Sequence, residues 1–284
     1  MSEDVSVGAL WRRWRDVLAE KGVGTASLDA KLLVGQALGF DALQLATRER
    51  ELVSTLLASE VAALMQRRLT GESVARIIGH KEFYGLEFGL NEATLEPRPD
   101  TELLVDLALK ALPKGGRFVD LGTGSGCIPI AVLANRRDAS GVATDINPRA
   151  LEIARRNAER NGVSDRLLFS QGDWFEAMGS EDRFDLVVSN PPYISSEVVE
   201  TLEPEVREFD PRLALDGGLD GLGPYRIIAA EAANWLRPGG KVLVEIGYDQ
   251  GAAVSALFAE AGFGRISVEK DLAGLDRVVS AHHI

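Results

Sequence analysis

The first 70 residues carry apolar side chains at the three- to four-residue spacing of amphipathic helices. Three stretches show this spacing, and Ser27 and Gly39 are suited to begin and end the second of them. Their apolar positions are Val7, Leu10, Trp11, Trp14, Val17 and Leu18, then Leu28, Leu32, Leu33 and Leu38, and then Val53, Leu56, Leu57, Val61, Leu64, Met65 and Leu69. We therefore expect residues 1–70 to form a small helical bundle with the tryptophans in its core.

Residues 71–95 follow a different pattern. The run from Phe83 through Gly85 to Phe88 places large apolar residues around a glycine, which is typical of a β-hairpin. We interpret this segment as a connector that leads into the rest of the chain.

From residue 96 to residue 284, short apolar strands alternate with helices. The expected strands are 117–121, 141–145, 166–170, 184–189, 241–246, 265–270 and 276–281, and the expected helices are 101–112, 127–136, 147–161, 223–236 and 249–261. This alternation predicts a Rossmann-like, doubly wound α/β fold with a seven-stranded sheet. The last two strands have no helix between them, so we expect one of them to run antiparallel to the others.

The composition is that of an ordinary soluble globular protein, with 45% hydrophobic and 26% charged residues among 284. The single cysteine, Cys127, excludes an intrachain disulfide. We recognise neither a cleavable leader nor an apolar run that could span a bilayer, so we expect a cytoplasmic protein without a membrane partner. Three histidines, and a turn at Asp216–Asp220 that lacks the final glutamate of a calcium loop, predict no metal site.

The formal charge of −12 is unevenly distributed. Residues 1–90 contain 11 Lys and Arg against 12 Asp and Glu, whereas residues 91–284 contain 20 against 31. An acidic surface repels a phosphate backbone, which argues against DNA or naked RNA as a substrate.

A candidate for the chemistry stands at the end of the apolar strand 184–189, where the chain continues as Asn190-Pro191-Pro192-Tyr193. The Asn190 side-chain oxygen and the Pro191 carbonyl can accept hydrogen bonds from both N–H bonds of a planar NH2 group, while the prolines fix the backbone. Tyr193 offers a flat face for stacking. The pattern therefore indicates a site that presents an amide or aromatic amine to a methyl donor, although Asn-Pro alone is also common turn punctuation.

A second candidate is the glycine turn Gly122-Thr123-Gly124-Ser125-Gly126, which joins the strand 117–121 to an apolar helix. Such corners bring the backbone close to a nucleotide-like ligand, but the spacing matches neither the dinucleotide nor the Walker fingerprint. The next strand ends at Asp145, an acid placed to bind ribose hydroxyls or to cap the following helix.

These motifs together resemble those of class I S-adenosylmethionine-dependent methyltransferases. More narrowly, the chain resembles the glutamine-N5 methyltransferases that modify the Gly-Gly-Gln loop of peptide-chain release factors, over nearly its whole length. The segments that carry the resemblance are Arg76–Gly85, Leu95–Glu102, Asp120–Gly126, Asn190–Ile194, Glu205–Gly218 and Gly274–Arg277. Ser73 and Glu96 depart from the family pattern, which has proline and an apolar residue there.

The resemblance implies a cofactor, S-adenosylmethionine, with a protein substrate clasped partly by the helical domain. It implies that Asp173 and Trp174 contact the adenine, unless they form only a turn with a surface tryptophan. Arg98, between two prolines, either orders the pocket or forms a salt-bridged corner. Phe83 and Tyr84 lie near the active site in the family, or serve only hairpin packing here.

We therefore expect an enzyme that transfers a methyl group from S-adenosylmethionine to the glutamine of a release factor, and that works as a monomer. No separate titratable base is apparent in the sequence. Two other acceptors remain open: a glutamine of ribosomal protein L3, and an exocyclic amine of a nucleic acid. A non-catalytic binding module that has kept the fold is a third alternative.

Overall fold

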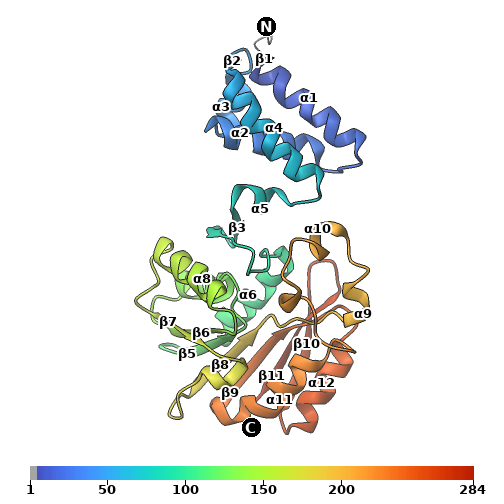
Figure 1. Cartoon of the computed structure of the whole chain (residues 1–284). Coiled ribbons are helices and arrows are strands. Elements are labelled where there is room, and N and C mark those ends of the chain that lie inside the picture. Colours follow the sequence, from blue (N-terminus) through green and yellow to red (C-terminus); the bar gives the residue numbers. More distant parts are fainter. Residues whose placement is uncertain (1–4) are drawn as a thin grey trace. The chain divides into compact units, whose positions relative to one another are not determined.

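Two units of different architecture make up the chain in a computed structural model that describes residues 5–284 (Figure 1). The first unit extends to Gly79, and the second comprises residues His80–Ile284. The expected division into 1–70, 71–95 and 96–284 stays a prediction about functional domains.

The first unit is a helical bundle. Its elements are β1 (Val5–Ser6), α1 (Val7–Glu20), α2 (Ala26–Leu38), α3 (Ala42–Thr47), β2 (Leu52–Val53), α4 (Thr55–Leu69) and α5 (Val74–Ile78). Trp11 lies in the core and Trp14 packs against it, as the helical spacing predicts. The predicted role of Ser27 as a helix cap is wrong, because Ser27 lies inside α2, which begins at Ala26 and has Thr25 at its N-cap position.

The second unit contains a seven-stranded sheet with the strand order β10-β11-β9-β8-β5-β6-β7. The strands are β5 (Arg117–Leu121), β6 (Ser140–Asp145), β7 (Leu167–Gln171), β8 (Phe184–Ser189), β9 (Leu236–Glu245), β10 (Gly264–Lys270) and β11 (Asp276–His282). β11 runs antiparallel to both of its neighbours, while β9, β8, β5, β6 and β7 are mutually parallel. The predicted doubly wound fold with one antiparallel strand is confirmed.

Alternate side chains of the strands enter two cores on opposite faces of the sheet. Phe118 and Leu186 join one core with the helices α6 (Glu102–Ala111), α7 (Cys127–Asn135) and α8 (Pro148–Arg160). Val119 and Val187 join the other with α11 (Gly223–Trp235) and α12 (Gly251–Glu260). Because the central strands are parallel, their carboxyl ends meet at one edge of the sheet, where α/β folds bind ligands.

A hairpin precedes the sheet. Its strands β3 (His80–Phe83) and β4 (Leu86–Gly89) pair antiparallel, and the side chain of Phe83 is buried in the core that contains α6. Short helices occupy the loops at the carboxyl edge: η1 (Pro99–Thr101), η2 (Trp174–Ala177), α9 (Ser196–Val199), α10 (Pro204–Arg207) and η3 (Arg212–Ala214). No helix within residues 5–284 combines the length and apolar character needed to cross a membrane.

Candidate active site

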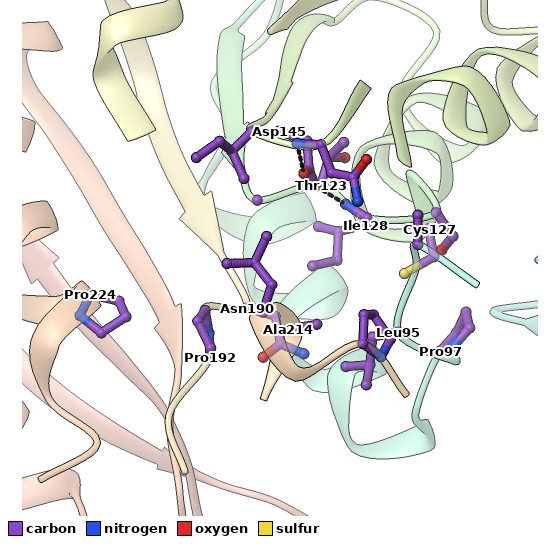
Figure 2. Close-up of a pocket in the computed structure, with 18 of the residues that line it drawn as sticks. Leu95, Pro97, Thr123, Cys127, Ile128, Asp145, Asn190, Pro192, Ala214 and Pro224 are labelled. Atoms are coloured by element: carbon purple, nitrogen blue, oxygen red, sulfur yellow. Dashed lines mark hydrogen bonds between the residues drawn. The ribbon is translucent and has the colours of Figure 1, made fainter. Parts of the chain in front are cut away.

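A cavity of about 350 Å³ opens at the carboxyl ends of β5, β6 and β8. Its volume lies within the range of about 300–1,000 Å³ that is usual for small-molecule sites. Figure 2 shows Asp145 and Thr123 at one end of this cavity, with Asn190 and Pro192 toward the other. The cavity therefore joins the two motifs that the sequence places 64 positions or more apart.

The glycine turn needs glycine for two different reasons. Gly122, Gly124 and Gly126 all have positive φ values, of 70°, 55° and 79°. A Cβ added at Gly122 or Gly124 would meet no atom within 4 Å, and both residues line the cavity. A Cβ at Gly126 would lie 3.0 Å from Ile130 Cδ1 and 3.1 Å from Ala154 Cβ, so this glycine permits close packing against α8.

Asp145 connects the end of β6 to the glycine turn. Its Oδ2 accepts a hydrogen bond of 2.9 Å from the Gly124 N–H, and its Oδ1 accepts one of 2.8 Å from the Asn147 N–H. Burial raises the pKa of Asp145, and the two backbone donors act against that rise. Each carboxylate oxygen has a second lone pair, so the side chain can also accept hydrogen bonds from a ligand. Asn147, and not Asp145, caps α8 by accepting from the Arg149 N–H.

Asp173 and Trp174 lie just beyond β7 and line the same cavity. The Trp174 backbone has a φ of 43°, a left-handed conformation that is uncommon for a bulky residue. Such backbone strain is often found at ligand sites. The indole packs partly against the core that contains α11, so Trp174 is not merely a surface residue.

The Asn190-Pro191-Pro192-Tyr193 segment leaves the end of β8. Asn190 Nδ2 donates a hydrogen bond of 3.2 Å to the Thr101 hydroxyl, and Asn190 and Pro192 line the cavity. Pro191 and Tyr193 are not among the described residues that line it. The Tyr193 carbonyl accepts a hydrogen bond of 2.9 Å from Gln250 Nε2, which fixes the segment from behind.

Two ion pairs hold the loops that border the cavity. Arg98 pairs at 2.7 Å with Asp210, whose side chain is only 2% exposed, and Arg98 also lines the cavity, so both suggested roles of this residue fit. Glu96, where the family pattern has an apolar residue, pairs at 2.7 Å with Lys81.

Two other residues discussed from the sequence have structural roles. In the first unit, Ser73 caps α5 by accepting from the Arg76 N–H. Tyr84 donates a hydrogen bond of 2.6 Å to Asp106 and has no place in the cavity lining among the described residues.

Two buried carboxyl groups near the cavity were not identified as site residues from the sequence. Asp120 and Glu245 are 0% and 2% exposed, and burial raises the pKa of each to about 7. Neither oxygen of Asp120 nor Oε2 of Glu245 has a hydrogen-bond partner among residues 5–284. The available signal was an acidic residue inside an otherwise apolar strand, in Phe-Val-Asp120-Leu and in Leu-Val-Glu245-Ile. Buried, unpaired acids of this kind are uncommon outside functional sites.

The fold and the site together define a methyltransferase, and comparisons with known proteins agree. Residues 99–209 match the family model described as "Methyltransferase small domain", and residues 9–79 match the "PrmC N-terminal domain". A crystal structure of a methyltransferase from Pyrococcus furiosus superposes with a TM-score of 0.54 and 18% identity, covering 78% of this chain and 98% of that one.

Two curated relatives are similar over almost their whole length. A protein of Agrobacterium fabrum is 46% identical over 98% of this chain and 97% of its own, and one of Caulobacter vibrioides is 46% identical over 95% and 93%. Both are named release factor glutamine methyltransferase. The chain therefore belongs to the release factor glutamine methyltransferase family, and it is an S-adenosylmethionine-dependent enzyme.

Proposed function

We propose that this enzyme methylates the side-chain amide nitrogen of the glutamine in the Gly-Gly-Gln loop of a peptide-chain release factor. The observation that carries the proposal is the orientation of Asn190. Its NH2 group is engaged by the Thr101 hydroxyl, so its Oδ1 remains free to accept one N–H bond of an incoming amide. The names of the curated relatives support the choice of a release factor as the acceptor protein.

The residues of the cavity fit S-adenosylmethionine. Gly122, Thr123, Gly124 and Ser125 would let the backbone approach the methionine part, while Gly126 supports this turn through its packing. Asp145 would accept hydrogen bonds from the ribose hydroxyls through its remaining lone pairs, and Asp173 and Trp174 would contact the adenine.

When bound, S-adenosylmethionine supplies a methyl group on a sulfonium sulfur, which is an excellent leaving group. The protein contributes alignment. Asn190 Oδ1 and the Pro191 carbonyl accept the amide N–H bonds, hold the nitrogen in place and stabilise the positive charge that it acquires. Pro192 lines the cavity beside Asn190, and the hydrogen bond from Gln250 to the Tyr193 carbonyl keeps this segment rigid. The amide proton leaves to water.

The distribution of charge supports a protein substrate over a nucleic acid, since residues 91–284 have an excess of 11 acidic residues. We expect the helical first unit to help bind the release factor, and the enzyme to act as a monomer in the cytoplasm.

The test is to incubate the enzyme and S-adenosylmethionine with a release factor, ribosomal protein L3 or RNA in parallel, and to measure the intact mass of each acceptor. We expect the mass of one methyl group to be added to the release factor alone. Modification of L3 or RNA, with an unmodified release factor, would refute the substrate and leave the enzyme class intact.

A further inference from the structure

A side-chain amide has two ends of nearly equal shape, one an acceptor and the other a donor. Rotating the Asn190 amide by half a turn would exchange Oδ1 and the NH2 group with little change in packing. The proposed reaction tolerates only one of these orientations. If the Asn190 NH2 group faced the substrate, two donors would face each other and the substrate N–H bond would have no acceptor. The active site therefore needs a device that selects the orientation of Asn190.

Thr101 is the hydrogen-bond partner of Asn190 and provides the first part of such a device. Its hydroxyl oxygen accepts the Asn190 NH2 group at 3.2 Å, and the residue is only 2% exposed. A hydroxyl can donate as well as accept, so Thr101 alone would also tolerate the rotated amide. Another group has to determine where the Thr101 proton goes.

Glu245 occupies the required position. Ser189 of β8 and Val244 of β9 are paired across the parallel sheet, so the residues that follow them occupy neighbouring positions, Asn190 just beyond β8 and Glu245 at the last position of β9. Burial raises the pKa of Glu245, and the neighbouring polar side chains of Thr101 and Asn190 act against that rise, which places both beside its carboxyl group. Thr101, Asn190 and Glu245 therefore form one connected cluster.

The carboxylate makes this cluster directional. In its ionised form, which dominates above about pH 7, the Glu245 carboxylate only accepts hydrogen bonds, so Thr101 must donate its single proton to it. The lone pairs of the Thr101 oxygen are then available to Asn190, which must present its NH2 group to them. As a result, Oδ1 of Asn190 remains at the cavity, where the proposed substrate amide would lie.

The burial of Glu245 is costly, which indicates a role other than stability. Its side chain is almost completely removed from water, and Oε2 has no hydrogen-bond partner among the described residues. An apolar residue of similar size would stabilise such a position better. Glu245 is also not among the described residues that line the cavity, whereas Thr101 and Asn190 are, so it acts through them and does not touch the substrate.

We propose that Glu245 and Thr101 are positioning residues, which set the amide of Asn190 with its oxygen toward the substrate through the chain Asn190 NH2 to Thr101 hydroxyl to Glu245 carboxylate. The proposal rests on the proposed function insofar as Asn190 must accept hydrogen bonds from a substrate NH2 group. It predicts that both residues affect turnover while leaving cofactor binding nearly unchanged.

The test compares two substitutions at position 101. Thr101→Val removes the hydroxyl at nearly constant shape, and Thr101→Ser keeps it. We expect Thr101→Val to lower kcat by about 10- to 100-fold, which corresponds to the loss of one well-placed hydrogen bond. Thr101→Ser should restore kcat to within about threefold of the native value, and the Kd for S-adenosylmethionine, measured by calorimetry, should change less than about threefold in both variants.

Glu245→Gln tests the other end of the chain. The neutral amide can turn its own NH2 group toward Thr101, so we expect kcat to fall about tenfold with an unchanged cofactor Kd. Thr94→Val is the matched control. Thr94 is also a buried threonine, its hydroxyl donates a hydrogen bond to the Asn91 carbonyl, and neither residue lines the cavity. It should leave kcat unchanged, and thermal unfolding should show that all four variants are folded at the assay temperature.

Native kcat in Thr101→Val or in Glu245→Gln would overturn the proposal, as would a Thr101→Ser variant as slow as Thr101→Val. Parallel losses of kcat and cofactor affinity would also overturn it, because they would indicate a general distortion of the pocket. The proposed function fails separately, if the native enzyme does not methylate the release factor. In that case the same comparison applies to whichever NH2-bearing acceptor the native enzyme does methylate.

Discussion

The carboxylate of Asp145 accepts a hydrogen bond of 2.9 Å from the backbone N–H of Gly124, and thereby joins the end of β6 to the glycine turn that follows β5. One side chain thus shapes the turn and also faces the cavity. Replacing Asp145 should therefore weaken binding of the cofactor more than binding of the acceptor protein.

Asp145→Ala should weaken binding of S-adenosylmethionine by about 30-fold or more, because the ribose loses its acceptors and the turn loses its anchor. Isothermal titration calorimetry measures this directly. Asp138→Ala is the matched control, since Asp138 also accepts a backbone hydrogen bond, from Gly115 at 2.7 Å, but lies outside the cavity lining. Equal losses in the two variants would refute the assignment of Asp145.

Asn190→Ala should separate catalysis from cofactor binding. Removing an acceptor aimed at the reacting nitrogen should lower kcat by about 10²- to 10³-fold. The Kd for S-adenosylmethionine should change only a few-fold, because Asn190 contributes mainly to the acceptor side of the cavity. Single-turnover kinetics together with calorimetry would distinguish the two effects, and equal losses in both would contradict this division of roles.

The ion pair between Arg98 and Asp210 should stabilise the loops around the cavity. Asp210 is almost completely buried whereas Arg98 is 39% exposed, so Arg98→Met should destabilise the fold by about 1–2 kcal/mol, between the values for exposed and buried pairs. Denaturant unfolding of Arg98→Met, Asp210→Leu and the double variant gives the coupling energy. We expect a coupling on the order of 1–3 kcal/mol, and strictly additive effects would show that the pair is not energetically linked.

Gly126→Ala should be more destabilising than Gly162→Ala. Both glycines have positive φ values, of 79° and 68°, so alanine is strained at either position. Only at Gly126 would the new Cβ press against Ile130 and Ala154, whereas at Gly162 it would meet no atom within 4 Å. We expect a difference of about 1–3 kcal/mol in the free energy of unfolding. Equal values would mean that the packing against α8 is not tight.

The two buried acids should make the apoenzyme less stable as the pH rises. Burial raises the pKa of Asp120 and of Glu245 from ordinary values of 3.8 and 4.5 to about 7. Between about pH 5 and pH 7 the native state keeps these protons while the unfolded state has lost them, so the free energy of unfolding falls with pH and levels off above pH 7. The loss is on the order of 3–4 kcal/mol for each group at most.

Asp120→Asn cannot titrate at this position, so its stability should decline less steeply from pH 5 to pH 8 than that of the native enzyme. Urea unfolding at several pH values measures both slopes. Parallel curves for the two proteins would show that the Asp120 carboxyl does not have the raised pKa.

The sequence predicts the positions of the strands well, because Phe-Val-Asp-Leu, Val-Ala-Thr-Asp and Leu-Val-Val-Ser are short apolar runs bounded by turn residues. The candidate residues follow from their places at the ends of those runs. The pairing of Asn190 with Thr101 across 89 positions, and of Arg98 with Asp210 across 112, depends on tertiary packing that no local pattern records.

The same limit applies to Glu245. Its place beside Asn190 results from the register of β8 and β9, in which Ser189 pairs with Val244. Periodicity indicates that both segments are strands, but it does not fix how far one is displaced along the other. The sequence shows a glutamate at the end of an apolar strand, but it does not show which side chains lie beside that glutamate in the fold.

The most direct test of the account is to locate the methyl group itself. The native enzyme, S-adenosylmethionine and a release factor would be incubated together, and the digested release factor sequenced by tandem mass spectrometry. We expect a single methyl group on the side-chain amide of the glutamine in the Gly-Gly-Gln loop. A methyl group on any other residue, or a loop that stays unmodified while the enzyme consumes its cofactor on another acceptor, would contradict it.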